Sequence, residues 1–217
     1  MGDTRIKLVL LDFDGTLVDT RRANARAYVA ALREAGYPLD EEEYLARYFG
    51  MRCDEFLTAY GIDDPDERER LRLRKIALYP SFFDSVRLNR PLWDFCRQFR
   101  AQGGRVWIVS TGSRENIDNV MRYLNLGAPA TPENLAASPE SPVSAGGRRT
   151  NKCMDFCVDG ILAGPDIARS KPAPDCFLEA MRREGVGPHE TLIFEDSVVG
   201  LEAARRSGAP YFKVTKE

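Results

Sequence analysis

Short apolar runs alternate along the chain with longer stretches in which apolar residues recur at helical spacing. The runs at 6–13, 105–110, 191–195 and 211–214 are typical of buried strands, and 156–162 is a weaker candidate. Amphipathic stretches predict helices at 21–36, 91–104, 113–127, 174–187 and 197–208. Because the strands are apolar almost throughout and alternate with helices, the pattern predicts an α/β fold with a doubly wound, Rossmann-like parallel sheet.

Two segments interrupt this alternation. Residues 17–88 are helical in pattern throughout, with no convincing strand, and predict a helical subdomain inserted after the first strand. The α/β core domain would then comprise residues 1–16 and 89–217. Within that core, residues 127–152 are rich in Pro, Ser, Ala and Gly and predict a long flexible loop insertion.

Composition and charge narrow the class of protein. The net charge of −2 over 217 residues, with scattered basic residues, argues against a nucleic-acid partner. No apolar run is long enough to span a membrane, and the N-terminus does not resemble a signal peptide. Five cysteines, an odd number, favour a reducing compartment, which we expect to be the cytoplasm. The sequence has a single histidine, His189, so no histidine is left for a Ser-His-Asp triad elsewhere in the chain. Acid–base chemistry is therefore expected to depend on carboxylates.

Polar residues follow several of the predicted strands where each strand ends. They are Asp12 and Asp14, Ser110 and Thr111, Glu195 and Asp196, and Lys171 just before a helix. The carboxyl ends of parallel strands meet at one edge of a sheet, where ligands bind. Three or four carboxylates gathered there would repel one another unless a divalent cation lay among them, and oxygen ligands favour Mg²⁺.

Four motifs resemble those of a known family, the haloacid dehalogenase-like hydrolases. They are "DFDGTLVD", "IVST", "SKPAPD" and "FEDSVVGLEAARRSG", in the order and at the strand ends that this family uses. The resemblance covers nearly the whole chain except residues 127–152. The insertion at 17–88 resembles the small helical cap of the group that includes phosphoglycolate phosphatases and β-phosphoglucomutases.

The resemblance implies roles for the two acids of the first motif. Asp12 would be the nucleophile that attacks phosphorus and forms an aspartyl-phosphate. Asp14 would protonate the leaving oxygen and then activate the water that hydrolyses the intermediate. The metal would be held by Asp12, Asp14 through its backbone carbonyl, and Asp196, with Glu195 as a further ligand or an outer partner.

The same resemblance implies phosphate-binding and substrate-binding residues. Ser110 and Lys171 would hold the phosphoryl oxygens, assisted by the backbone amide of Thr111. In the cap, Arg52 and Lys75 are substrate candidates, although basic residues on a solvated helix are an equally good interpretation of each. The candidates for a grip on a second phosphate, as in β-phosphoglucomutases, are Ser113, Arg114 and Asn116.

The function predicted on this basis is that of a cytoplasmic, monomeric, Mg²⁺-dependent phosphatase of a small phosphorylated metabolite, such as a sugar phosphate. The first alternative is a phosphosugar mutase, which is less favoured because Asn24 stands where a β-phosphoglucomutase has histidine. Haloacid dehalogenation is disfavoured because that chemistry lacks the second acid, Asp14. A third alternative is a catalytically silent binding protein, which the unusual segment 127–152 favours and the intact acid cluster disfavours.

Overall fold

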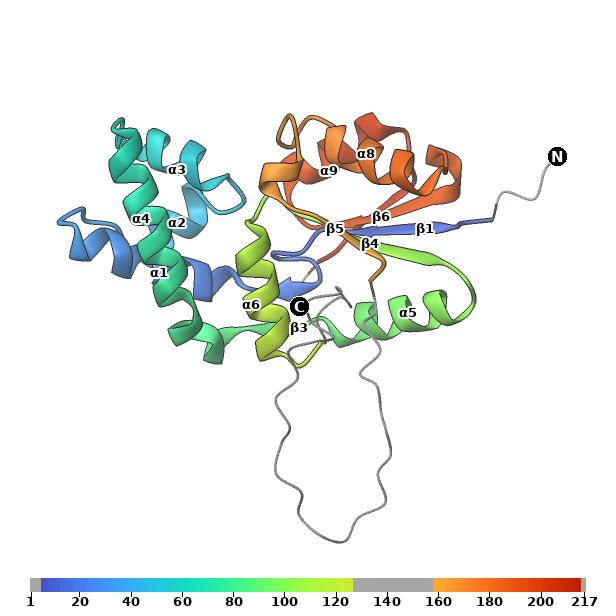
Figure 1. The fold of residues 1–217 in the computed structure, drawn as a ribbon, viewed down its shortest axis with the longest axis horizontal. Helices are drawn as coiled ribbons and strands as arrows, with labels where there is room; N and C mark the ends of the chain where they lie inside the picture. Colours follow the sequence, from blue (N-terminus) through green and yellow to red (C-terminus); the bar gives the residue numbers. More distant parts are fainter. Residues whose placement is uncertain (1–4, 127–157, 216–217) are drawn as a thin grey trace, which may run out of the picture.

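The computed structural model describes residues 5–126 and 158–215, so the predicted loop at 127–152 lies outside the described residues. Its centre is a five-stranded parallel sheet in the order β5-β4-β1-β6-β7 (Figure 1). The strands are β1 (Leu8–Leu11), β4 (Arg105–Val109), β5 (Gly160–Leu162), β6 (Thr191–Glu195) and β7 (Tyr211–Lys213). The predicted doubly wound α/β fold is therefore confirmed, including the weakest of the five expected strands.

The central strand β1 is buried on both faces of the sheet. Val9 and Leu11 point into one apolar cluster, whereas Leu8 and Leu10 point into a second cluster on the opposite face. All four side chains are fully buried. This explains why the strand is apolar without alternation, since neither face meets water.

Helices cover both faces of the sheet (Figure 1). Apolar residues of α5 (Arg90–Ala101) and α6 (Arg114–Tyr123) belong to the Val9 cluster. Those of α8 (Asp175–Glu184) and α9 (Val198–Ser207) belong to the Leu8 cluster. Ser113 and Ser197 cap α6 and α9 by accepting the backbone N–H groups of Asn116 and Gly200. Short 3₁₀ turns, η2 (Gly164–Asp166) and η3 (Pro188–Glu190), precede α8 and β6.

A separate group of helices lies between β1 and β4 in the chain and beside the sheet in space (Figure 1). It consists of α1 (Arg21–Glu34), α2 (Glu41–Arg47), α3 (Cys53–Tyr60), α4 (Pro65–Leu78) and the 3₁₀ helix η1 (Tyr79–Ser85), which together we call the cap. The cap has an apolar cluster of its own, rich in aromatic side chains such as Tyr28, Tyr44 and Phe56.

The cap is joined to the sheet by two strands that the sequence did not predict. β2 (Val18–Asp19) and β3 (Arg87–Leu88) form an antiparallel pair at its entry and exit. The expectation of no strand within 17–88 is therefore wrong at both ends of that range. Two residues per strand are too few to leave a recognisable alternation. No helix in the described parts of the chain is long and apolar enough to cross a membrane.

Candidate active site

Residues from four separate segments meet at the carboxyl edge of the sheet. Asp12 follows β1, Ser110 follows β4, and Asp196 follows β6, whose last residue is Glu195. Lys171 comes from the segment between η2 and α8. Because β1, β4 and β6 are parallel and adjacent, their carboxyl ends fall side by side, as the sequence predicted.

Lys171 is the centre of this group. Its Nζ donates to Oδ1 of Asp12 at 2.7 Å and to Oε1 of Glu195 at 2.6 Å. Its side chain is only 3% exposed. Burial alone would lower the pKa of Lys171, but Asp12 and Glu195 outweigh that effect and hold its pKa above the ordinary value. Lys171 is therefore a permanent cation at the edge of the sheet.

One lysine does not balance the carboxylates around it. Asp12 is buried, and burial raises its pKa well above the ordinary value despite the opposing field of Lys171. The neighbouring carboxylates Glu195 and Asp196 raise the pKa of Asp12 further. An additional cation at this position would favour the ionised form of Asp12.

The acids are arranged so that a cation fits among them. Carboxylate oxygens of Asp12, Glu195 and Asp196 lie within 4.8 Å of one another. A Cβ added at Gly15 would collide with the Asp196 carboxylate, so Gly15 is needed for this close approach. Thr16 donates to Oδ1 of Asp196 at 3.1 Å and fixes its orientation. A set made only of oxygen donors fits a hard cation such as Mg²⁺.

Protein donors hold the Glu195 carboxylate at both of its oxygens. Besides Lys171, its carboxylate accepts the backbone N–H of Ser197 at 2.9 Å and the Ser197 hydroxyl at 3.1 Å. It is fully buried and lies against Gly200, where a Cβ would collide with it. Protein donors therefore occupy both oxygens of Glu195. This favours the interpretation of Glu195 as an outer partner of the metal site, which holds Lys171, over that of a direct metal ligand.

Asp14 points away from that cluster and toward the cap. Its Oδ1 accepts hydrogen bonds from the Thr20 hydroxyl and from Nδ2 of Asn24, the latter at 3.2 Å. Its Oδ2 accepts from the Ser110 hydroxyl at 3.4 Å. Asp14 therefore has hydrogen-bonding partners in both the core and the cap, although Asp12 is only two residues away.

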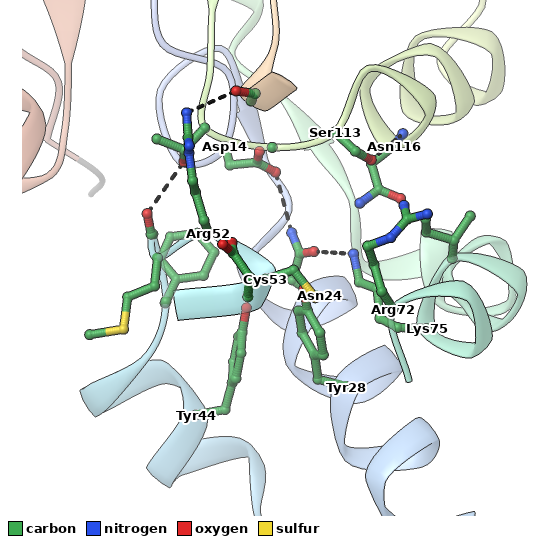
Figure 2. Close-up of a pocket in the computed structure, with 18 residues that line it drawn as sticks. Asp14, Asn24, Tyr28, Tyr44, Arg52, Cys53, Arg72, Lys75, Ser113 and Asn116 are labelled. Carbon is green, nitrogen blue, oxygen red and sulfur yellow. Dashed lines mark hydrogen bonds between the residues drawn. The ribbon is translucent and has the colours of Figure 1, made fainter. Parts of the chain in front are cut away.

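A chamber of about 410 Å³ lies between Asp14 and the cap (Figure 2). Its core side is formed by the loop after β4 and the start of α6, and its cap side by α1, α3, α4 and the loop before α3. The labelled residues on its wall are Asp14, Asn24, Tyr28, Tyr44, Arg52, Cys53, Arg72, Lys75, Ser113 and Asn116. A volume of this size suits a small metabolite.

Lys75 is a buried cation on the chamber wall. Its side chain is 1% exposed, and its Nζ donates to Oδ1 of Asn24 at 2.7 Å. The ammonium also lies over the rings of Tyr79, at 3.8 Å, and Tyr28, at 5.0 Å. Burial lowers the pKa of Lys75 from 10.5 to about 8, against the opposing field of Asp14. The interpretation of Lys75 as a solvated helix residue is therefore wrong.

We expect the Lys75→Met variant to be more stable than the wild type at pH 7. The lowered pKa corresponds to a penalty of up to about 3 kcal/mol, from which we subtract about 1 kcal/mol for the bond to Asn24. Between pH 8 and 10.5 the unfolded state binds more protons, so wild-type stability from this group rises with pH. The advantage of the variant, about 1–2 kcal/mol in urea unfolding, should therefore shrink above pH 8.

The exposed Lys213→Met variant is the control, and its stability relative to the wild type should not follow this pH dependence. A Lys75→Met variant that is less stable than the wild type at pH 7 would contradict the account of a strained buried cation. A buried cation that destabilises the fold and faces a chamber is typical of a functional residue.

Of the other residues predicted to bind substrate, three line the chamber and one does not. Ser113 and Asn116 line the chamber, and Oδ1 of Asn116 is buried with no hydrogen-bond partner in the part of the chain that the structure describes. Arg52 lines the chamber from the cap. Arg114 does not line it and instead pairs with Asp118 one helical turn away, at 3.0 Å. Thr111 lines the chamber, and its hydroxyl donates to the cap at Gly50 O.

Sequence reasoning missed several residues of the site. Thr20 and Tyr79 complete the network around Asn24, since Nδ2 of Asn24 also lies 3.2 Å from the Tyr79 hydroxyl. Gly200 makes room for the Glu195 carboxylate, with which a Cβ at this position would collide. The apolar-to-acid change after β1 located Asp12 and Asp14, but nothing comparable marks these partners.

Comparison with known proteins identifies the family. A model of haloacid dehalogenase-like hydrolases matches residues 6–208, so the chain belongs to this family. The four motifs predicted this family, and that prediction is confirmed. Its relatives include phosphatases.

Two relatives and one solved structure are similar over nearly the whole chain. A fructose-1-phosphate phosphatase of Escherichia coli is 26% identical, covering 92% of both chains. A 6-phosphogluconate phosphatase of the same organism is 24% identical, covering 96% of this chain and 82% of the relative. The structure of CbbY from Rhodobacter sphaeroides in complex with phosphate has a TM-score of 0.74 at 22% identity, covering 95% of this chain and 84% of CbbY. This last likeness supports the fold.

Proposed function

We propose that this chain is a Mg²⁺-dependent phosphomonoester hydrolase that acts on small phosphorylated metabolites through an aspartyl-phosphate on Asp12. The observation that carries the proposal is the meeting of Asp12, Lys171 and Asp196 at one sheet edge beside a chamber that contains Asp14. The names of its relatives, phosphatases of fructose 1-phosphate and 6-phosphogluconate, support a substrate of sugar-phosphate size.

In the first half-reaction, a carboxylate oxygen of Asp12 attacks phosphorus. An oxygen–phosphorus bond forms to Asp12 while the ester bond to the leaving oxygen breaks. Asp14 gives its proton to that oxygen, so the product leaves as an alcohol. Lys171, which already contacts Oδ1 of Asp12, would stabilise negative charge on the phosphoryl oxygens, together with the Ser110 hydroxyl.

In the second half-reaction, Asp14 acts in the opposite sense. Its carboxylate removes a proton from a water molecule, whose oxygen attacks the phosphorus of the aspartyl-phosphate. The bond between phosphorus and the Asp12 oxygen breaks, which releases inorganic phosphate and restores the carboxylate. Hydrogen bonds from Thr20 and Asn24 would hold Asp14 in one orientation for both proton transfers.

Asp12 and Asp196 would hold the Mg²⁺, and Glu195 would act from behind Lys171. The backbone carbonyl of Asp14 is the further ligand that the family pattern implies. The bound cation supplies positive charge that reduces the repulsion between the nucleophile and a dianionic ester.

Asn24 favours hydrolysis over the mutase alternative. A mutase keeps the phosphoryl group and returns it to a second hydroxyl of a sugar, and Asn24 stands where a β-phosphoglucomutase has histidine. Asn24 occupies the position between Asp14 and Lys75, and its carboxamide does not titrate in the physiological range. This arrangement supports water as the acceptor of the phosphoryl group.

Phosphate release from a panel of phosphorylated metabolites, with Mg²⁺ and with EDTA, tests the proposal. We expect metal-dependent release from some sugar phosphates or phosphorylated acids. The panel is then repeated with a sugar bisphosphate added as primer. Formation of an isomer of the phosphosugar, without release of free phosphate, would show that the protein is a mutase. Silence under every condition would contradict catalysis and favour a binding protein.

A further inference from the structure

Arg52 connects the cap to the core of the protein. It lies at the start of α3, and its Nη2 donates to the backbone oxygens of Gly164 and Ile167, both at 2.8 Å. These acceptors are 112 and 115 residues away and belong to the η2 turn and its end. Within the described residues Arg52 forms no ion pair with a carboxylate. Its guanidinium group is thus hydrogen-bonded to two neutral carbonyl groups of the core.

The turn that Arg52 contacts is itself fixed to the loop after β4. The Gly164 N–H donates to Gly112 O at 2.9 Å. A Cβ at Gly164 would lie 2.7 Å from the backbone oxygen of Thr111, so only glycine allows this approach. The loop after β4 also carries Ser110, one of the proposed phosphate-binding residues. The position of the cap is therefore linked through the turn to the place where the phosphoryl group would bind.

A further hydrogen bond joins the same two parts of the molecule. The Thr111 hydroxyl donates to Gly50 O at 3.3 Å, two residues before Arg52. Residues 50–52 thus contact the core at both the η2 turn and the loop after β4. Elsewhere the cap meets the core through the Asn24 side chain, which donates to Asp14, through packing of η1 on α6, and through its covalent connections at β2 and β3. Loss of the contacts at 50–52 would leave this edge of the chamber open.

The Nε of Arg52 is a buried donor without an acceptor. It has no hydrogen-bond partner among the described residues, and the side chain lines the chamber (Figure 2). A buried donor without an acceptor is unfavourable, because it has lost its hydrogen bonds to water without replacement. An oxygen of a molecule in the chamber would satisfy it. The residue that closes the chamber is therefore also placed to contact what the chamber holds.

We propose that Arg52 is the latch that keeps the cap closed over the chamber, and that a hydroxyl or carboxylate oxygen of the leaving group completes the latch by accepting from Nε. The second clause rests on the proposed function, whereas the first does not. Arg52 is then a positioning residue, whose contacts with the core matter before any substrate binds. The sequence alone left Arg52 either as a substrate candidate or as a basic residue on a solvated helix.

Hydrogen–deuterium exchange of the ligand-free Arg52→Met variant tests the latch. Methionine keeps the unbranched stem but has no donor for Gly164 O or Ile167 O. We expect roughly tenfold faster exchange in peptides covering 48–56 and 160–168, as for the loss of about two net hydrogen bonds. Exchange in β4 and in α1 should stay at the wild-type rate. The matched control is Arg70→Met, since Arg70 is exposed and, within residues 5–126 and 158–215, pairs with Glu67 on its own helix.

The Arg52→Lys variant is a second test in case Arg52→Met does not fold. Lysine keeps the positive charge but lacks the planar guanidinium that reaches both carbonyl groups. We therefore expect exchange rates in the same peptides between those of the wild type and of Arg52→Met. Unchanged exchange in both Arg52 variants would overturn the latch. Faster exchange spread through α1 and the other cap helices would also overturn it, because Arg52 would then only stabilise the fold.

Kinetics test the substrate contact separately. With a substrate found in the phosphate-release panel, Arg52→Met should lower kcat/KM at least about tenfold while Arg70→Met leaves it unchanged. Wild-type kcat/KM in Arg52→Met would refute the contact through Nε. If the wild type releases no phosphate at all, the proposed function fails, but the exchange experiment on ligand-free protein still decides the latch.

Discussion

The Asp12→Asn variant is expected to lose turnover by a factor of about 10⁴ or more, because a carboxamide does not attack phosphorus. The substitution changes neither size nor shape, and the amide oxygen still accepts from Lys171. It also removes a buried acid whose pKa is raised by burial and by the neighbouring Glu195 and Asp196, so stability should not fall. Phosphate release and thermal unfolding, measured on the same preparation, check both statements.

The control for this prediction is Asp84→Asn, which changes an exposed acid of the cap in the same way. Turnover of that variant should equal that of the wild type. An Asp12→Asn variant that keeps turnover within tenfold of the wild type would refute a covalent role for Asp12.

The Lys171→Met variant is expected to lose both activity and stability. Without its cation, Asp12 and Glu195 remain buried beside each other, and breaking a buried pair in this way is unfavourable by about 3–5 kcal/mol. The variant also lacks the group that would hold the phosphoryl oxygens. Urea unfolding in the presence of EDTA measures the loss of stability without interference from a bound cation.

A second substitution separates the two losses. Adding Glu195→Gln to Lys171→Met removes one of the unpaired buried charges, so part of the stability should return. Activity should not return, because Lys171 itself is needed at the phosphoryl group. A Lys171→Met protein as stable as the wild type would contradict the picture of a buried cation that neutralises two acids.

The sequence was sufficient to predict the sheet and the edge of it at which the candidate site lies. β1 and β4 are nearly continuous apolar runs because both faces of the sheet are covered, and each run ends in the polar residue that belongs to the site. Parallel pairing of adjacent strands then brings Asp12 and Ser110 to one edge without any further information. Local pattern and topology together fixed these positions.

Several residues on the chamber wall were candidates from the sequence, but the contacts that hold them there were not predictable, because each joins distant segments through single side chains. Lys75 meets Asn24 across 51 residues, and Arg52 meets Gly164 across 112. Neither contact leaves a periodic signal, and a lysine or arginine on a helix more often faces water. The β2–β3 pair escaped prediction for the same reason, since two residues per strand form no pattern.

Chemical trapping of the intermediate tests the central claim most directly. Wild-type protein turning over a panel substrate with Mg²⁺ is quenched with borohydride, which reduces an acyl phosphate of aspartate to homoserine. Trypsin then releases residues 8–21, between Lys7 and Arg21, and mass spectrometry locates the change. The account predicts homoserine at Asp12 alone, and none when substrate is omitted. Steady phosphate release with unmodified Asp12, or with homoserine at Asp14 or Asp19, would contradict it.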